Sequence, residues 1–242
     1  MESKEFHVSG EHKVGKTLNK LGVDIAHPKF PGVFIETGTN DGAGTDWALS
    51  LPDVFHSIFS CEIWEPNFID LRVHYQATRL AGYSEVPLIA GSDDQLTSVI
   101  RKMTTGGTFL EIALLDSRIW LPILLKTRVD AALIWLDAHP GSGVPSELGL
   151  PLKDELKALR EFSHPDDVVL IDDINHFGTD IDGGCYKDTT REYVFEQLKE
   201  IYPDHEIIST IGMEAFFSEA HGYDDYFAVI PPHLVGTFKG ND

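Results

Sequence analysis

The sequence predicts an α/β protein whose core is one mostly parallel sheet of seven strands, with helices on both faces and an antiparallel last strand. The first observation behind this prediction is a series of short apolar runs, each of strand length and each followed by Gly, Asp, Asn or Ser. The second is the helical pattern after most of these runs, because strands that alternate with helices form parallel sheets. The third is the end of the chain, where only a loop separates the last two runs, which indicates an antiparallel pair at the sheet edge.

The elements can be placed along the chain from these patterns. An amphipathic helix containing Val14 and Leu18 is expected within an N-terminal extension, residues 1–30. Strands are predicted at residues 33–35, 57–61, 86–90, 131–136, 168–171, 205–210 and 226–230. Helices are predicted at residues 45–51, 67–80, 94–103, 152–162 and 190–202. Residues 104–129 fit no pattern clearly, and a helix with an insertion is one interpretation. No linker divides the chain, so residues 1–242 are expected to form one domain.

The composition limits the partners and the compartment. The formal net charge is −20 over 242 residues, which argues against duplex nucleic acid or an anionic membrane as partner, since both require a basic surface. No apolar stretch reaches the length of about 18 residues that a membrane span needs, and no signal peptide is visible. The cysteines Cys61 and Cys185 do not suggest a disulfide framework, so a reducing, cytoplasmic setting is predicted. The oligomeric state stays open, with a homodimer as one option.

Residues 10–17, GEHKVGKT, match the phosphate-binding P-loop pattern G-x-x-x-x-G-K-[ST]. A P-loop requires a buried strand before the glycine-rich turn and a helix after it, whose free N–H groups face the phosphate. Here the preceding residues 1–9 are mostly polar, and glycine and proline soon interrupt the helical pattern that follows. A P-loop NTPase using Lys16 and Thr17 on phosphate, with Asp137 as a second acidic motif, is therefore kept only as an alternative.

Acidic residues follow nearly every predicted strand, at the point where the strand ends. In a parallel α/β sheet, ligands bind outside the carboxyl ends of the strands. One acidic residue at such a place could be a helix cap, but acids at five strand ends along one edge indicate a ligand site. The strand-end residues are Glu36, Glu62, Gly91-Ser92-Asp93, Asp137-Ala138-His139 and Asp172-Asp173.

The first strand leads into a glycine-rich turn, VFIETGTNDGAGT at residues 33–45, and then into a helix. Gly38 and Gly42 allow the backbone to turn tightly and to approach a ligand closely. The spacing differs from the G-x-G-x-x-G of dinucleotide-binding proteins, and Glu36 at the strand end would repel a pyrophosphate. The turn therefore suits a cationic or hydroxylic ligand.

This stretch resembles the first motif of class I S-adenosylmethionine-dependent methyltransferases, E/D-x-G-x-G-x-G, which reads here E-T-G-T-N-D-G with Asn40 at the middle glycine. Glu62 matches the acid that holds the cofactor ribose, with Glu65 as a competing choice, and residues 91–93 match the segment that flanks the adenine. The resemblance covers about residues 30–230 and implies a Rossmann-like methyltransferase fold that binds S-adenosyl-L-methionine. The cofactor-binding residues that it implies are Glu36, Gly38, Asn40, Gly42, Thr45, Glu62, Ser92, Asp93 and Asp137.

Asp137, Asp172 and Asp173 end two strands that are adjacent in this topology, so their carboxylates are expected to converge. Such a cluster repels itself unless a divalent cation such as Mg²⁺ binds it. The set resembles the metal site of metal-dependent O-methyltransferases, including those that act on antibiotic sugars. Their first motif is Asp-x-Asp, whose second Asp acts as base, and His139 stands at that position here. The resemblance implies these three aspartates as metal ligands and His139 with Asp137 as catalytic residues; His139 also stays open as a ligand, and His176 is interpreted as a surface-loop residue.

Together these features predict an enzyme that transfers a methyl group from S-adenosylmethionine to a hydroxyl of a sugar, a glycan or a small molecule, assisted by a divalent cation. The sugar follows from the resemblance to sugar methyltransferases. Two alternatives remain beside it. One is the P-loop NTPase that would use residues 10–17, and the other is a non-catalytic cofactor-binding domain, because a fold can persist without its chemistry.

Overall fold

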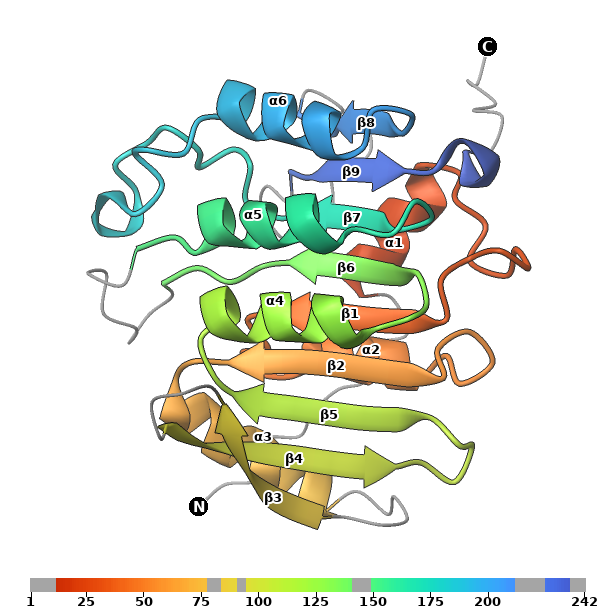
Figure 1. Cartoon of the computed structure of the whole chain (residues 1–242), viewed down its shortest axis with the longest axis vertical. Coiled ribbons are helices and arrows are strands. Elements are labelled where there is room, and N and C mark those ends of the chain that lie inside the picture. The colour runs from red at the N-terminus through yellow and green to blue at the C-terminus, as the bar shows by residue number, and fades with distance from the viewer. Residues whose placement is uncertain (1–11, 78–83, 91–94, 141–148, 212–224, 236–242) are drawn as a thin grey trace.

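The computed structural model describes residues 12–77, 84–90, 95–140, 149–211 and 225–235, which form one nine-stranded sheet with helices on both faces (Figure 1). The strand order is β3-β4-β5-β2-β1-β6-β7-β9-β8. The strands are β1 (Val33–Thr37), β2 (Ser57–Glu62), β3 (Ser84–Ala90), β4 (Gln95–Met103), β5 (Phe109–Leu114), β6 (Ala132–Leu136), β7 (Val168–Ile171), β8 (Glu206–Ser209) and β9 (Phe227–Ile230). The α-helices are α1 (Lys13–Lys20), α2 (Ala43–Leu49), α3 (Glu65–Ala77), α4 (Ser117–Thr127), α5 (Leu152–Phe162) and α6 (Arg191–Ile201).

The centre of the sheet is parallel, as the alternation of strands and helices predicts. Strands β5, β2, β1, β6 and β7 all pair in parallel, whereas β9 pairs antiparallel with both β7 and β8. The chain reverses its direction of travel across the sheet between β1 and β6, and ligands bind at such a switch point in open α/β sheets. This arrangement confirms the Rossmann-like methyltransferase fold with an antiparallel last strand, although the sheet has nine strands and not seven.

The third parallel strand is not the one that the sequence pattern indicated. Residues 84–90 form β3, but β3 pairs antiparallel with β4 at the edge of the sheet. The helix predicted at residues 94–103 is wrong, because residues 95–103 form β4, with the β-branched Val99 and Ile100 fully buried. The strand beside β2 is instead β5, followed by α4, within the segment that no pattern placed. Short apolar runs fit a helix and a strand equally well, and here cross-strand pairing decides between them.

The two faces of the sheet carry separate hydrophobic clusters. Every residue of β1, β6, β7 and β9 is buried, as expected for strands covered on both sides. Ile35 and Ile134 pack with α4, α5 and α6, which lie in front of the sheet in Figure 1. Phe34 and Leu133 point to the other face and pack with α1, α2 and α3. No helix in the described part of the chain has the length and apolar character needed to cross a membrane.

Helix α1 accounts for the GEHKVGKT segment without a phosphate. The helix begins at Lys13, so Gly15 lies inside it and not in the turn that a P-loop requires. A Cβ on Gly15 would lie 2.7 Å from Trp47 Nε1, so this glycine lets α1 pack closely against α2. Thr17 is fully buried, and Lys16 is exposed. Gly10 and Glu11 lie outside the described residues, and the P-loop alternative is not favoured.

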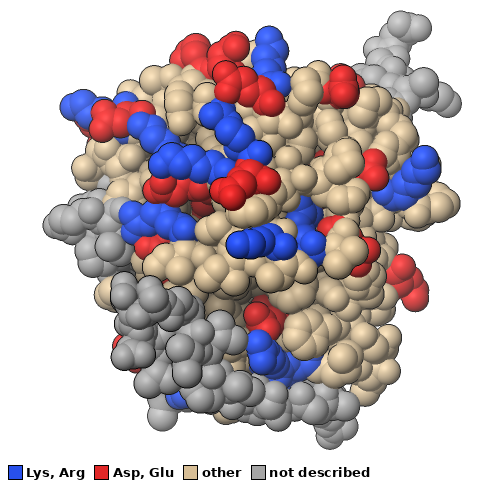
Figure 2. Space-filling model, in the orientation of Figure 1, with Lys and Arg blue, Asp and Glu red and all other residues tan. Residues whose placement is uncertain are grey.

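The face formed by α4, α5 and α6 carries both signs of charge side by side (Figure 2). Ion pairs account for part of this pattern, with Arg160 Nη2 2.5 Å from Glu200 Oε2 and Lys157 Nζ 2.6 Å from Asp154 Oδ1. Exposed pairs of this kind contribute little to stability, because solvent and salt screen them. On this face the surface is therefore mixed in charge and not a single basic patch.

Candidate functional site

A cavity of about 390 Å³ opens at the carboxyl ends of β1, β2, β5 and β6, where parallel α/β sheets bind ligands. Its volume lies in the range of about 300–1,000 Å³ that is typical of small-molecule sites. Several of its lining residues are those that the sequence predicted, and others come from the start of α4. Among them are Gly38, Asn40, Glu62, Leu115, Asp116, Asp137 and His139.

The glycine-rich turn after β1 forms one wall of this cavity and has the backbone conformation that its sequence suggested. Gly38, Asn40 and Gly42 all have positive φ angles, of 79°, 49° and 87°. A Cβ on Gly38 would lie 2.7 Å from the carbonyl oxygen of Asp137, so the turn packs directly against the end of β6. Gly38 and Asn40 line the cavity, whereas Gly42 lies behind it, at the N-terminus of α2.

Glu62 is the acidic residue of β2 that faces the cavity. Its Oε2 accepts a hydrogen bond from the Asn40 N–H at 2.8 Å, and its Oε1 accepts one from the Trp64 N–H at 2.7 Å. Burial raises the pKa of the Glu62 carboxyl, and these backbone bonds partly offset that effect. Glu65 is exposed at the start of α3 and does not line the cavity, so the structure favours Glu62 as the ligand-facing acid.

Glu36 and Thr45 lie behind the glycine-rich turn and not on the cavity. The Glu36 carboxylate accepts hydrogen bonds from the hydroxyls of Thr45 at 2.8 Å and Ser60 at 2.7 Å. Burial raises the pKa of Glu36 to about 8, although both hydroxyls act in the opposite direction. A Cβ on Gly44 would overlap Glu36 Oε1, so α2 closes directly over the carboxylate. In this position Glu36 and Thr45 hold the turn from behind.

The segment predicted to flank the adenine, residues 91–93, follows a strand at the edge of the sheet. Ser92 and Asp93 lie outside the described residues, and the strand before them is not the neighbour of β2. The end of β5 takes that place, and Asp116 with Arg118 lines the cavity there. Asp116 caps α4 by accepting the Arg118 N–H at 2.9 Å, and it also pairs with the Arg118 guanidinium. The missed signal was the apolar run Phe109–Leu114 immediately before Asp116.

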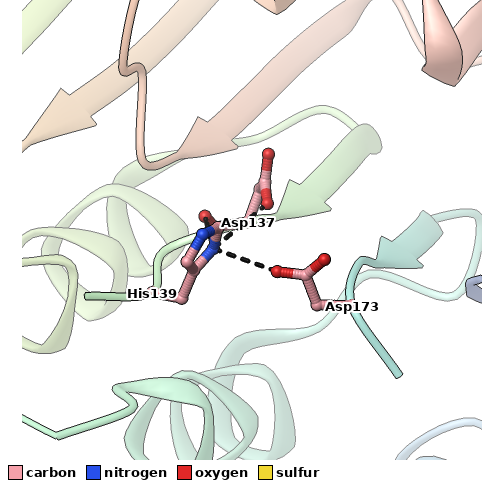
Figure 3. Close-up of side chains that lie close together, drawn as sticks. All are labelled: Asp137, His139 and Asp173. Carbon is pink, nitrogen blue, oxygen red and sulfur yellow. Dashed lines mark hydrogen bonds and ion pairs between the residues drawn. The ribbon is translucent and has the colours of Figure 1, made fainter. Parts of the chain in front are cut away.

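Two aspartates and a histidine meet at the ends of β6 and β7 (Figure 3). Within the described residues, Asp137, His139 and Asp173 are the group whose ligand atoms all lie within 4.8 Å of one another. His139 Nδ1 is 3.2 Å from Asp173 Oδ2 and 3.5 Å from Asp137 Oδ1. Asp173 has a φ of 58°, and the Tyr186 hydroxyl donates a hydrogen bond to its Oδ2 at 2.9 Å.

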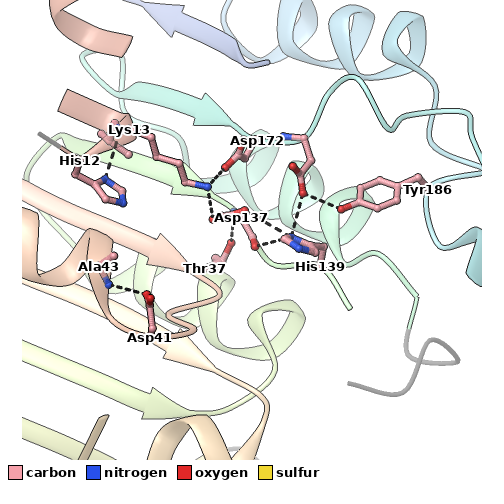
Figure 4. Close-up of polar contacts among 11 residues, drawn as sticks. His12, Lys13, Thr37, Asp41, Ala43, Asp137, His139, Asp172 and Tyr186 are labelled. Carbon is pink, nitrogen blue, oxygen red and sulfur yellow. Dashed lines mark hydrogen bonds and ion pairs between the residues drawn. The ribbon is translucent and has the colours of Figure 1, made fainter. Parts of the chain in front are cut away.

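Asp172, the third predicted metal ligand, is not part of this group. Its Oδ2 contacts the Lys13 ammonium, which is also 3.2 Å from Asp137 Oδ2 (Figure 4). Its Oδ1 accepts the backbone N–H of Asp173 at 2.8 Å. Burial and the neighbouring Asp137 raise the pKa of Asp172, whereas the Lys13 ammonium lowers it. The predicted set of three aspartates is therefore replaced by two aspartates and His139.

The donor set of Asp137, His139 and Asp173 fits a divalent cation. Asp137 Oδ1 is buried and has no hydrogen-bond partner in the described structure. Two carboxylates and an imidazole suit Mn²⁺ or Zn²⁺ better than Mg²⁺, which prefers oxygen ligands alone. In the absence of a cation, burial lowers the pKa of His139, but Asp137 and then Asp173 and Asp172 outweigh burial and raise it to about 9. His139 is then an imidazolium near neutral pH.

Other predicted or neighbouring residues lie around this group without lining the main cavity. His176 packs on the Tyr186 ring, with their centroids 5.4 Å apart. Glu155, at the start of α5, is buried against a second, much smaller pocket that Asp137 and Asp173 also line. Burial raises the pKa of Glu155 to about 7, and Ser117 and Thr37 lower it through hydrogen bonds.

Comparison with known proteins gives structural neighbours but no family. No protein-family model matches the chain, and no curated protein matches it either. Among solved structures, an O-methyltransferase from Bacillus cereus with S-adenosylhomocysteine shares 13% identity over 91% of this chain and 82% of that chain, with a TM-score of 0.45. The O-methyltransferase TomG from Streptomyces achromogenes, with S-adenosylmethionine, shares 14% over 91% and 81%, with a TM-score of 0.43. The methyltransferase PaMTH1 of Podospora anserina, with S-adenosylhomocysteine, shares 11% over 91% and 80%, with a TM-score of 0.46.

Similarity at these identities and TM-scores carries no argument about activity or substrate. The strand order and the glycine-rich turn place the chain in the fold class of the class I S-adenosylmethionine-dependent methyltransferases.

Proposed function

We propose that this chain is an S-adenosylmethionine-dependent O-methyltransferase. The observation that carries the proposal is the cavity at the switch point of the sheet, where Gly38 and Asn40 face Glu62 across the ends of β1 and β2. A buried carboxylate suits the two neighbouring hydroxyls of a ribose, because each carboxylate oxygen accepts hydrogen bonds and charged acceptors bind more strongly than neutral ones. A glycine-rich turn at this place lets backbone groups approach the ligand closely.

The acceptor side of the reaction belongs to the cluster of Asp137, His139 and Asp173, since Asp137 and His139 also line the cavity. S-adenosylmethionine, when bound, supplies a methyl group already activated by its sulfonium. The protein then has to orient a hydroxyl and take up its proton. Asp173, itself held by Tyr186, orients His139 through Nδ1, and Nε2 of the deprotonated imidazole would take the hydroxyl proton at a pH near or above the pKa of about 9.

A divalent cation is the second part of the proposal. Asp137, His139 and Asp173 would hold it, and its chemistry would be to lower the pKa of a bound hydroxyl. If His139 bound a cation through Nδ1, its ring proton would stay on Nε2, and Nε2 could not accept a second proton from the hydroxyl. His139 would therefore serve either as a metal ligand or as the base. Methyl transfer that survives exhaustive chelation would assign His139 as base, and loss of transfer with recovery on adding Mn²⁺ would assign it as ligand.

The acceptor that we propose is a hydroxyl of a sugar, a glycan or another small molecule. The acidic balance of the chain, −20 at neutral pH, supports a small acceptor over duplex nucleic acid. A panel of hydroxyl compounds with labelled S-adenosylmethionine tests this part. Cofactor binding without transfer to any acceptor would favour a non-catalytic cofactor-binding domain.

Calorimetric titration with S-adenosylhomocysteine tests the cofactor site directly. We expect micromolar binding by the natural chain and a loss of about 10- to 100-fold in Glu62→Gln, since hydrogen bonds to a charged group contribute about 1.5–3 kcal/mol each. Glu65→Gln is the matched control, because Glu65 is exposed on α3 and does not line the cavity. Absence of binding by the natural chain would contradict the function, and unchanged binding by Glu62→Gln would contradict the placement of the ribose.

A further inference from the structure

Lys13 brings a positive charge from the N-terminal helix to the acidic strand ends. Its Nζ is 3.2 Å from Asp137 Oδ2 and also contacts Asp172 Oδ2, so one ammonium bridges the carboxylates that end β6 and β7 (Figure 4). These two residues lie 124 and 159 positions further along the chain. The bridge is thus made by tertiary folding and not by local sequence.

The position of the ammonium is determined by buried contacts on several sides. The Asp172 side chain is only 1% exposed, and that of Asp137 is 13% exposed, so both carboxylates need a nearby positive charge. The Lys13 ammonium also lies 4.8 Å from the centroid of the Trp135 ring, at a distance typical of cation–π contacts. Val14 and Leu18 are fully buried under the sheet and fix α1 beside the site.

The carboxylate oxygens of Asp137 and Asp172 differ in their partners. Lys13 takes one oxygen of Asp137 and one of Asp172, and the backbone N–H of Asp173 takes the other oxygen of Asp172. Asp137 Oδ1, which lacks a hydrogen-bond partner in the described structure, faces His139 on the opposite side. Both oxygens of Asp172 thus already contact donors of the chain, and one of them lies against an ammonium that would repel a metal cation, although the sequence places Asp172 directly at the end of β7.

We infer that Lys13 takes the place of a divalent cation on Asp137 and Asp172, and thereby determines that a metal at this site uses Asp137, His139 and Asp173. This inference rests on the cation site of the proposed function. With Lys13 present, the donors include an imidazole, which Mn²⁺ and Zn²⁺ accept readily. Without Lys13, Asp137 and Asp172 would offer oxygen ligands alone at the position of the ammonium, and these suit Mg²⁺. Lys13 is therefore a specificity-determining residue for the metal.

Titration of the metal-free protein with Mg²⁺ and with Mn²⁺, followed by calorimetry, tests the inference. Lys13→Met removes the ammonium but keeps the aliphatic stem, and we expect Mg²⁺ affinity to rise by about tenfold or more, because a competing charge at contact distance is lost. Lys13→Arg retains the charge and should bind Mg²⁺ as weakly as the natural chain. Lys16→Met is the matched control on the exposed side of α1 and should leave both affinities within about twofold.

Asp172→Asn examines the same question without altering α1. In the natural background we expect Asp172→Asn to lower Mn²⁺ affinity by no more than about 10- to 100-fold, whereas Asp137→Asn should abolish binding. In the Lys13→Met background, Asp172→Asn should remove the gain in Mg²⁺ affinity. Equal Mg²⁺ binding by Lys13→Met and the natural chain would overturn the inference, as would a loss of Mn²⁺ binding in Asp172→Asn as large as that in Asp137→Asn.

Titration of the same variants with S-adenosylhomocysteine separates this inference from the function on which it rests. Lys13 does not line the cofactor cavity, so Lys13→Met should bind S-adenosylhomocysteine like the natural chain. Cofactor binding together with unchanged Mg²⁺ affinity would overturn only the role of Lys13. Absence of cofactor binding in every variant, the natural chain included, would overturn the proposed function.

Discussion

The acidic residues at the two ends of the site have different kinds of partner. At the β1–β2 end, Glu36 accepts hydrogen bonds from two hydroxyls, and Glu62 accepts them from two backbone N–H groups. At the β6–β7 end, the aspartates lie against the ammonium of Lys13 and the imidazole of His139. The first end is built from partners at most 24 positions apart, whereas the second needs a residue more than 120 positions away.

This difference indicates what each end can do. Neutral donors hold Glu62 in place without cancelling the charge of its carboxylate, so at the β1–β2 end this side chain stays fit to accept hydrogen bonds from a ligand. Charged partners can be exchanged for another cation, so the β6–β7 end is suited to take up a metal or a proton. The contrast predicts that substitutions at the first end change ligand affinity or stability, and that substitutions at the second change turnover or metal binding.

The largest effect is expected for His139→Ala, at the β6–β7 end. Removal of a general base typically lowers the rate by about 10²- to 10⁴-fold, and we expect kcat for methyl transfer to fall in this range while the affinity for S-adenosylhomocysteine stays within about threefold. His176→Ala is the control, because His176 lies beside Tyr186 but off the cavity. A drop in cofactor affinity that equals the drop in kcat would show that the two ends are not separate.

At the β1–β2 end, Glu36→Gln should change how the free energy of unfolding depends on pH. The pKa of Glu36 is raised from 4.5 to about 8 in the folded state, so between these values the folded chain holds a proton that the unfolded chain releases. The free energy of unfolding of the natural chain therefore falls as pH rises from about 4.5 to about 8, and this contribution is constant above that range. Urea unfolding measured between pH 5 and pH 9 should show that the free energy of unfolding falls less steeply with pH in Glu36→Gln than in the natural chain.

Glu65→Gln serves as the control for that experiment, because Glu65 is exposed. Its free energy of unfolding should change with pH as that of the natural chain does. An identical slope in Glu36→Gln would mean that the buried carboxylate does not take up a proton on folding. In that case the two hydroxyl donors would be sufficient to keep Glu36 ionised behind the turn.

Gly15→Ala should give the smallest effect, through the helix that carries Lys13. The new Cβ would lie 2.7 Å from Trp47 Nε1, and overpacking of this kind costs about 1–3 kcal/mol, against a gain of about 1 kcal/mol in helix propensity. We expect a net loss of about 1 kcal/mol in urea unfolding. Gly106→Ala is the control, since its Cβ would meet ordinary contacts at 3.5 Å from Pro52, and a larger loss there would contradict the packing argument.

The sequence predicted the strand ends that line the cavity, except for the end of β5. Gly38, Asn40, Glu62 and Asp137 line the cavity, and each of them ends a buried strand or follows one within three residues, so the signal that located them is local. Asp116 was missed because residues 84–103 contain apolar runs as strong as that of β5, and local pattern cannot say which run pairs with β2.

By itself, the sequence determined the α/β class, the parallel centre of the sheet and the edge at which acidic residues gather, because strand periodicity and strand-end residues depend on near neighbours. Only the tertiary structure decided that β3 and β4 form an antiparallel edge, that Glu36 lies behind the turn and that Lys13 bridges Asp137 and Asp172. Strand pairing and charge pairing between distant segments depend on the free energy of packing the whole chain, which no local pattern contains.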